Sequence, residues 1–162
     1  MVTAVDIRPA TPNDVPLILS FIKDLALYEK APEAVVATEE LLHKNLFGSE
    51  RRYAEVIIAY VEDKAAGFAL FFHNFSTWTG RPGLYLEDLF VRPEFRGLGI
   101  GKKLLTQLAH IAKERECGRY EWVVLDWNEP SRKFYEAMGA KPQTEWVIYR
   151  AEGKSLDDLA AM

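Results

Sequence analysis

The sequence predicts a single α/β domain that spans residues 1–162. Its length of 162 residues is that of one ordinary domain and is sufficient to bury a hydrophobic core. Segments with apolar residues at helical spacing alternate with short β-branched and aromatic segments, which indicates interleaved helices and strands. No repeat, low-complexity tract or linker-like stretch interrupts this pattern, so one domain is expected.

The first half of the chain carries clear start and stop signals. Thr11 and Pro12 form a helix start, because threonine caps a helix and proline fits its first turn. Thr38 caps a second helix, and Gly48 ends it. These signals and the apolar spacing predict a strand at 5–8, helices at 11–30 and 38–47, and an antiparallel hairpin of strands at 54–61 and 67–75.

The second half contains the most regular helix of the sequence. Its apolar residues recur at three- and four-residue spacing between residues 100 and 112, and it ends before Gly118. Pro93 ends the strand that precedes it, since proline cannot donate to a sheet. The predicted elements are strands at 84–91, 121–126 and 144–150, helices at 100–117 and 128–138, and a short C-terminal helix that Ser155 caps.

Composition excludes several classes of function. A net charge of −4 and a pI near 5.5 give no electrostatic reason to expect nucleic acid or a membrane surface as a partner. Cys117 is the only cysteine, and His43, His73 and His110 lack metal-ligand spacing, so no disulfide and no metal site are expected. Without an apolar run of about 18 residues or a signal peptide, we expect a soluble cytoplasmic protein.

The chemically informative segment joins the strand at 84–91 to the strong helix. Three of its residues are glycines, which permit conformations and close approaches that a Cβ would block. The free N–H groups of the helix start, together with the positive end of its dipole, favour a phosphate or pyrophosphate. Lys102 stands where a dinucleotide fingerprint needs a third glycine, and no P-loop Gly-Lys-Ser/Thr follows. The segment reads Arg96, Gly97, Leu98, Gly99, Ile100, Gly101 and Lys102.

This segment resembles the acetyl-CoA pyrophosphate loop of the Gcn5-related N-acetyltransferases (GNAT). Further segments at 27–29, 84–91 and 127–131 resemble the spermidine/spermine (diamine) N1-acetyltransferase group, which includes the thialysine N-acetyltransferases. The resemblance extends from Ile7 to Arg150. It implies a mixed, mostly antiparallel central sheet flanked by helices, acetyl-CoA as cosubstrate, no metal, and a homodimer with a small amine as substrate.

Acetyl transfer from a thioester to an amine requires an acid and a base. An alkyl amine is almost fully protonated at pH 7, so a base must remove a proton before it attacks. Glu87 is the candidate base, because a carboxylate inside an apolar strand is costly unless it is paired or useful. The resemblance implies that it acts through a water molecule. Alternatively, Glu87 only forms an ion pair with a basic neighbour.

Tyr135 is the candidate general acid. A phenol can donate a proton to a departing thiolate, and the resemblance places this tyrosine at the acetyl-CoA sulfur. Alternatively, Tyr135 is an ordinary core or surface aromatic residue. A covalent route through Cys117 would need a base beside the thiol, and the sequence indicates none.

The resemblance also implies a set of contacts to acetyl-CoA. Free backbone N–H groups at Leu89 and Val91 would bind its acetyl and pantetheine parts, and the loop would bind its pyrophosphate. Asn128 is equally well explained as a helix N-cap. The full expected set is Leu89, Phe90, Val91, Arg96, Gly97, Leu98, Gly99, Ile100, Gly101, Lys102, Asn128, Ser131 and Lys133.

Acidic and aromatic residues are the candidates for the acceptor side, because they suit a substrate with a second ammonium group. Within a regular strand, Glu87 and Asp88 would point to opposite faces unless a bulge intervenes. The segments at 124–128 and 76–78 look more like the thialysine branch than the polyamine enzymes, so small diamines and lysine analogues stay open. The expected set is Tyr28, Glu29, Glu87, Asp88, Glu121, Trp122, Glu145 and Trp146.

Two further hypotheses remain open at this point. One keeps the enzyme and changes the acceptor to a protein or antibiotic amine, since an acidic pocket also binds a basic peptide. The other is a CoA-binding regulatory module without turnover.

Overall fold

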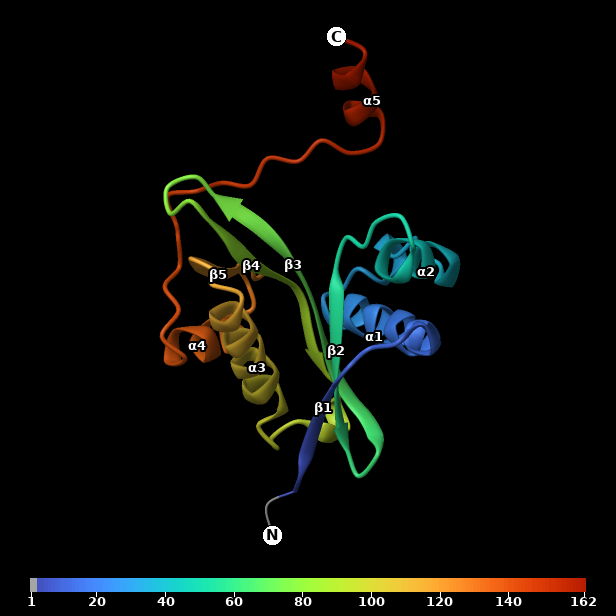
Figure 1. The fold of residues 1–162 in the computed structure, drawn as a ribbon, viewed down its shortest axis with the longest axis vertical. Coiled ribbons are helices and arrows are strands. Elements are labelled where there is room, and N and C mark those ends of the chain that lie inside the picture. Colours follow the sequence, from blue (N-terminus) through green and yellow to red (C-terminus); the bar gives the residue numbers. More distant parts are fainter. Residues whose placement is uncertain (1–2) are drawn as a thin grey trace. The chain divides into compact units, whose positions relative to one another are not determined.

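The computed structural model describes residues 3–162, which form two compact units. The first unit extends to Val123, and the second comprises Val124–Met162. All five strands lie in the first unit (Figure 1). None of the described helices is both long and apolar enough to cross a membrane.

The five strands form one sheet in the order β1-β2-β3-β4-β5. The first three pairings are antiparallel, and β4 pairs with β5 in parallel, so the predicted mixed, mostly antiparallel sheet is confirmed. The strands are β1 (Val5–Pro9), β2 (Glu55–Val61), β3 (Lys64–Ser76), β4 (Arg81–Val91) and β5 (Arg119–Trp122).

Helices cover both faces of this sheet. Figure 1 shows α1 (Val15–Tyr28) and α2 (Glu39–Phe47) on one face and α3 (Ile100–Glu114) on the other. The predicted caps are present: Thr11 and Asp14 form a capping box, and the Thr38 hydroxyl accepts from Leu41 N–H at 3.2 Å. Short 3-10 turns cover Pro12–Asp14, Pro32–Ala34 and Pro93–Phe95.

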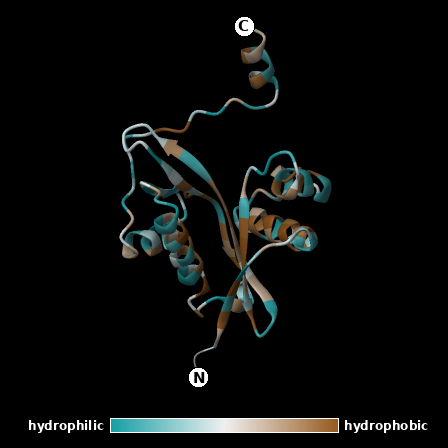
Figure 2. Ribbon diagram, viewed as in Figure 1, coloured by the Kyte–Doolittle hydropathy of each residue, from teal (hydrophilic) through white to brown (hydrophobic). Residues whose placement is uncertain are grey.

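Two apolar layers hold the sheet between its helices, and Figure 2 shows hydrophobic residues in the strands and along α1. Under α1 and α2, the rings of Phe21 and Phe68 stack with their centroids 5.0 Å apart. Under α3, the predicted helical stripe is buried at Ile100, Leu104, Leu105, Leu108 and Ala112. Apolar burial on both faces therefore stabilises the strands that carry the site.

The second unit contains α4 (Glu129–Ala137) and α5 (Lys154–Ala160). The predicted strand at 144–150 is wrong, because these residues pair with no strand in the part of the chain that is described. Its β-branched and aromatic residues instead lie exposed, with Tyr149 94% exposed. The preceding strand also ends at Trp122 rather than at residue 126.

Candidate active site

The glycine-rich loop forms a backbone cradle at the start of α3. Gly97 and Gly99 have φ values of 82° and 75°, in the left-handed region that glycine adopts without strain. The first backbone bond of the helix runs from Lys103 N–H to Gly99 O at 3.0 Å. The N–H groups of the three residues at 100–102 therefore have no acceptor within the helix, and no side chain caps it in the described chain. This end of α3 suits an anion.

The second half of β4 has an open edge. The parallel pairing with β5 ends at Leu86, opposite Trp122. Arg92 N–H donates to Ala66 O on the β3 side at 2.9 Å, and hydrogen-bonding directions alternate along an antiparallel strand. The N–H groups of Leu89 and Val91 therefore point away from β3, toward an edge without a partner strand within residues 3–123. Phe90, between them, is a buried core residue.

A β-bulge at Glu87 changes the direction of the two acids of β4. Leu70 pairs with Asp88 and Phe71 pairs with Leu86, so Glu87 is an extra residue on this strand. Leu70 belongs to the core under α1 and α2, which places Asp88 on that face of the sheet. Tyr85, which pairs with Phe72, lies on the same face, and the charge of Glu87 acts on both Tyr85 and Asp88. Glu87 therefore lies beside Asp88 on this face instead of pointing to the opposite one.

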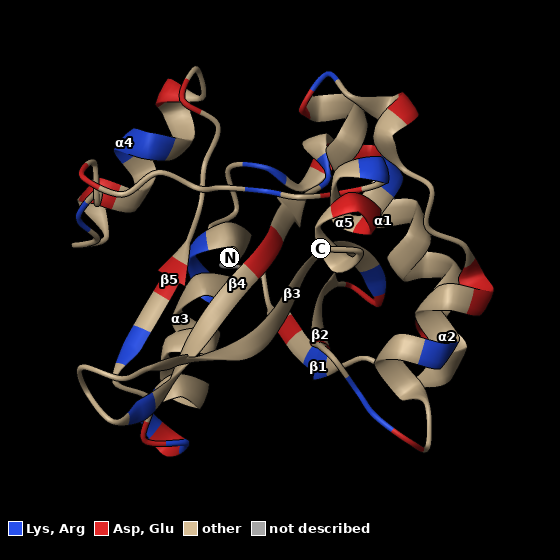
Figure 3. Cartoon of the chain, turned by 90° about the horizontal axis from the view of Figure 1, so that it is seen from above, with Lys and Arg blue, Asp and Glu red and all other residues tan. Residues whose placement is uncertain are grey.

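Acidic side chains gather on this face, and Figure 3 shows the acidic segment of β4 in the sheet. Burial raises the pKa of Asp88 to about 7, and the negative charges of Glu87 and Glu29 contribute to this rise. Burial also raises the pKa of Glu29, which follows the last residue of α1. Among the described residues, Glu87 forms no ion pair, so the alternative of a simple salt bridge finds no support.

The acidic face continues onto β5 through the predicted Glu121, whose neighbours Tyr85 and Asn74 the sequence did not single out. The pKa of Tyr85 is raised by burial and by the charges of Glu87 and Glu121, and its ring lies 5.0 Å from that of Phe72. Asn74 Nδ2 donates to Glu121 Oε1 at 3.5 Å. These neighbours could be found only from the strand register, because they come from three different strands.

Trp122 is not brought to this face. It pairs in register with Leu86, and Leu86 pairs with Phe71, so its side chain points to the α3 side of the sheet. Its ring lies 4.9 Å from that of Tyr120, whose hydroxyl donates to Leu105 O on α3. The structure therefore favours a packing role for Trp122.

The second unit carries the other predicted residues. Tyr135 lies on α4, half-buried, with its ring 5.5 Å from that of Phe134. Asn128 is buried and caps α4, its side chain accepting from Ser131 N–H at 3.3 Å, so the alternative N-cap role is confirmed. Three further predicted residues have exposed side chains: Lys133, Glu145 and Trp146. Lys133 Nζ lies 3.9 Å from Glu129 Oε1.

A thiol–imidazole pair exists that the sequence did not indicate. Cys117 Sγ lies 3.8 Å from His73 Nδ1. His73 Nδ1 is also 2.9 Å from Gly83 O, which can only accept, so this nitrogen carries the proton. The other ring nitrogen, Nε2, is 2.8 Å from Arg115 Nη1 and must accept from it. With both nitrogens engaged in this way, His73 is not placed to deprotonate Cys117.

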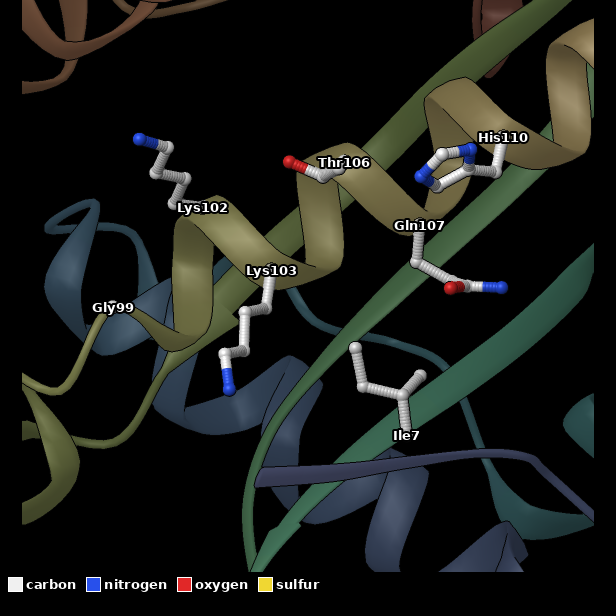
Figure 4. A pocket seen from close by; sticks show the side chains of 7 residues that line it. All are labelled: Ile7, Gly99, Lys102, Lys103, Thr106, Gln107 and His110. Carbon is white, nitrogen blue, oxygen red and sulfur yellow. The ribbon is translucent and has the colours of Figure 1, made fainter. Parts of the chain in front are cut away.

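A groove of about 490 Å³ lies between α3 and β1. Figure 4 shows Lys103 and Gln107 extending from α3 on the side where Ile7 lies, with Lys102 and His110 on the same helix. The groove begins at Gly99, so the two lysines add positive charge beside the backbone cradle.

Comparison with known proteins identifies the family. A sequence model described as the acetyltransferase (GNAT) family matches residues 22–140, a range that includes both the cradle and α4. The chain belongs to this family. It is therefore an N-acetyltransferase, and members of the family use acetyl-CoA.

Relatives narrow the group within the family. The chain is 39% identical to a thialysine N-epsilon-acetyltransferase from Bos taurus, over 95% of this chain and 96% of that protein. It is 33% identical to an L-ornithine N5-acetyltransferase from Arabidopsis thaliana, over 94% of this chain and 86% of that protein. A solved integron cassette protein from V. cholerae has a TM-score of 0.80 and 32% identity, covering 100% of this chain and 99% of that chain.

Proposed function

We propose that the protein transfers an acetyl group from acetyl-CoA to a primary amine of a small diamine, polyamine or thialysine-like lysine analogue. The carrying observation is the acidic face formed by Glu29, Glu87, Asp88 and Glu121 around Tyr85. Four acids beside an open strand edge suit a substrate with two ammonium groups. Two of the relatives are named for acetyltransferase activity on thialysine and on ornithine, which are amines of this kind.

The backbone of this chain fits acetyl-CoA. The three N–H groups at 100–102 and the helix dipole suit the pyrophosphate, and Lys102 adds charge to the loop of Arg96, Gly97, Leu98, Gly99, Ile100 and Gly101. The N–H groups of Leu89 and Val91 are the candidates for the acyl and pantetheine carbonyls. When bound, acetyl-CoA supplies the acetyl group as a thioester.

The acids of the bulge prepare the amine. A carboxyl with a pKa of about 7 can take up a proton at neutral pH, and Asp88 has this property. We therefore propose that Glu87 and Asp88 together accept the ammonium proton, with Glu29 and Glu121 binding the second ammonium. Tyr135 is the proposed donor to the departing sulfur, since a phenol has an O–H that can be donated as the thiolate forms.

Transfer by direct attack of the amine is favoured over an acetyl-cysteine route. His73 holds its proton on Nδ1, toward Gly83 O, and accepts from Arg115 at Nε2. A nucleophilic Cys117 would need an adjacent base, and this imidazole has no free lone pair to serve as one.

We also propose a homodimer. The exposed apolar side chains of Trp146, Val147, Ile148 and Tyr149 support it, because a run of four such residues in water is unfavourable unless another surface covers it. Light scattering coupled to size-exclusion chromatography measures the mass directly, and an 18.5 kDa species at micromolar concentration would contradict the dimer.

A CoA-release assay tests the function. The amine panel comprises spermidine, spermine, putrescine, 1,3-diaminopropane, lysine, thialysine, ornithine and a basic peptide. We expect turnover on a small amine with two cationic groups, a reduction of about 10²-fold or more in Glu87→Gln/Asp88→Asn, and a similar loss in Tyr135→Phe with acetyl-CoA binding retained. Turnover confined to the peptide would favour a protein acceptor, and binding of acetyl-CoA without any turnover would favour a regulatory module.

A further inference from the structure

Arg96 contacts two separate segments of the first unit, the end of β4 and the end of α1. Its Nε donates to Val91 O at 3.1 Å, at the open end of β4. Its guanidinium carbon lies 5.2 Å from the ring centroid of Tyr28 and 5.7 Å from that of Phe90. The two rings lie 6.5 Å apart and are tilted by 53°. The first residue of the cofactor loop is thus attached both to β4 and to the last residue of α1.

We infer that Arg96 is a positioning residue that couples the acetyl-CoA loop to the acceptor-binding end of α1, an inference that rests on the proposed function. Tyr28 directly precedes Glu29, whose charge acts on Asp88. A guanidinium that holds Tyr28 therefore also fixes the backbone that places Glu29.

Val91 completes the connection on the cofactor side. Its carbonyl and its N–H both point away from β3, and Arg96 binds that carbonyl. Acetyl-CoA bound to the loop and to Val91 N–H holds the segment 91–96 in the arrangement in which Arg96 meets Tyr28. Binding of the cosubstrate consequently raises the affinity for the amine.

The shape of the side chain matters as much as its charge. A planar guanidinium can donate to a carbonyl and lie against two aromatic rings at once, whereas a lysine ammonium is a compact, strongly hydrated charge. Arg96→Lys keeps the charge beside the loop and removes the stacked contact. A residue whose task was only to attract phosphate would tolerate this change.

The chain offers a matched control. Arg51 lies over the ring of Tyr53 at 4.9 Å to the centroid, which is the same kind of contact outside the site. Arg51→Lys removes an equivalent stacked guanidinium, so it reports the general effect of the substitution. Tyr28→Leu removes the other partner of the proposed coupling.

Hydrogen exchange with and without acetyl-CoA tests the coupling independently of turnover. In the wild-type protein and in Arg51→Lys, we expect acetyl-CoA to slow exchange in two segments, the loop at 96–103 and the end of α1 at 25–31. The amides of Glu29, Lys30 and Ala31 are hydrogen-bonded at this helix end and report its opening. In Arg96→Lys, we expect protection of the loop alone.

Kinetics supply the second readout. We expect Arg96→Lys and Tyr28→Leu each to raise the KM for the amine about 3- to 10-fold, and to raise the Kd for acetyl-CoA by a smaller factor. The double variant should be no worse than the single ones, because both remove one contact. Retained protection at 25–31 in Arg96→Lys, or a weakened Kd for acetyl-CoA with an unchanged KM for the amine, would overturn the inference. Absence of turnover in the wild type would refute the proposed function, while the exchange data would still decide the coupling.

Discussion

Replacing Asp88 by asparagine removes a carboxyl whose ionisation the folded protein disfavours. Burial and neighbouring acids raise its pKa from 3.8 to about 7, so the folded state binds this proton more tightly than the unfolded chain does. The contribution of Asp88 to the free energy of unfolding therefore becomes less favourable as pH rises from about 4 to about 7, and stays constant above that range.

The size of the effect follows from the shift. At about 1.4 kcal/mol per pKa unit, the carboxyl of Asp88 destabilises the folded state by about 4 kcal/mol at pH 8, where it is ionised, and by about 2 kcal/mol at pH 5, where the folded protein holds it protonated. An asparagine at this position cannot ionise and keeps the shape of the side chain. We therefore expect Asp88→Asn to be more stable than the wild type, with an advantage that grows by about 2 kcal/mol from pH 5 to pH 8.

Urea unfolding followed by far-ultraviolet circular dichroism, at pH 5 and at pH 8, measures both free energies of unfolding. Glu136→Gln is the control, because it removes one negative charge from an exposed position on α4 and should change stability by less than about 0.5 kcal/mol at either pH. An advantage of Asp88→Asn that is equal at both pH values would refute the reasoning, since it would show that the carboxyl ionises as readily in the folded state as in the unfolded chain.

Three further predictions concern the framework of the site. Gly99→Ala should lower the free energy of unfolding by about 1–2 kcal/mol, because a φ of 75° strains any residue with a Cβ. Gly101→Ala is the control and should not lower it in this way, because Gly101 lies outside the left-handed region of φ. Equal urea midpoints for the two variants would contradict the prediction. Leu108→Ala, at a fully buried position of α3, should cost about 2–5 kcal/mol by the same assay, and a cost below about 1 kcal/mol would contradict close packing there. Arg115→Met should lower the free energy of unfolding by about 0.5–1 kcal/mol at pH 7, because Arg115 donates to Glu55 and lowers the pKa of that carboxyl. The contribution of this ion pair is present above the unfolded pKa of Glu55 and is lost as pH falls through the lowered pKa. A cost that is unchanged at pH 3 would refute the role of this ion pair.

Local patterns in the sequence predicted most of the framework. The spacing of apolar residues in α3 and the caps at Thr11 and Thr38 depend on neighbouring residues alone, and the structure confirms them. The segment 144–150 has the composition of a strand, yet a strand also needs a partner for its hydrogen bonds, which composition does not encode. Its prediction failed for that reason.

The electrostatics of the site could be predicted only in part. Glu87 and Asp88 stand out in the sequence as acids inside an apolar strand. The pKa of Asp88, however, depends on burial in the folded sheet and on Glu29, which lies 59 positions away in the chain. The contacts of His73 with Cys117 and Arg115 depend likewise on the return of the chain at the end of α3. The raised pKa of Asp88 and the contacts of His73 both arise from tertiary packing, so residue types alone could not predict them.

One irregularity in β4 accounts for two features of the site. The pairing with β5 ends at Leu86, and the bulge occupies the next residue, Glu87. A bulge bends its strand and increases its twist, which directs the following residues away from the line of the neighbouring strand. The N–H groups of Leu89 and Val91 are thereby left at an open edge, and the same extra residue turns Glu87 and Asp88 to one face. Because both features follow from a single backbone insertion, the proposed cosubstrate contacts and the proposed base are fixed relative to each other by the covalent chain itself rather than by side-chain packing.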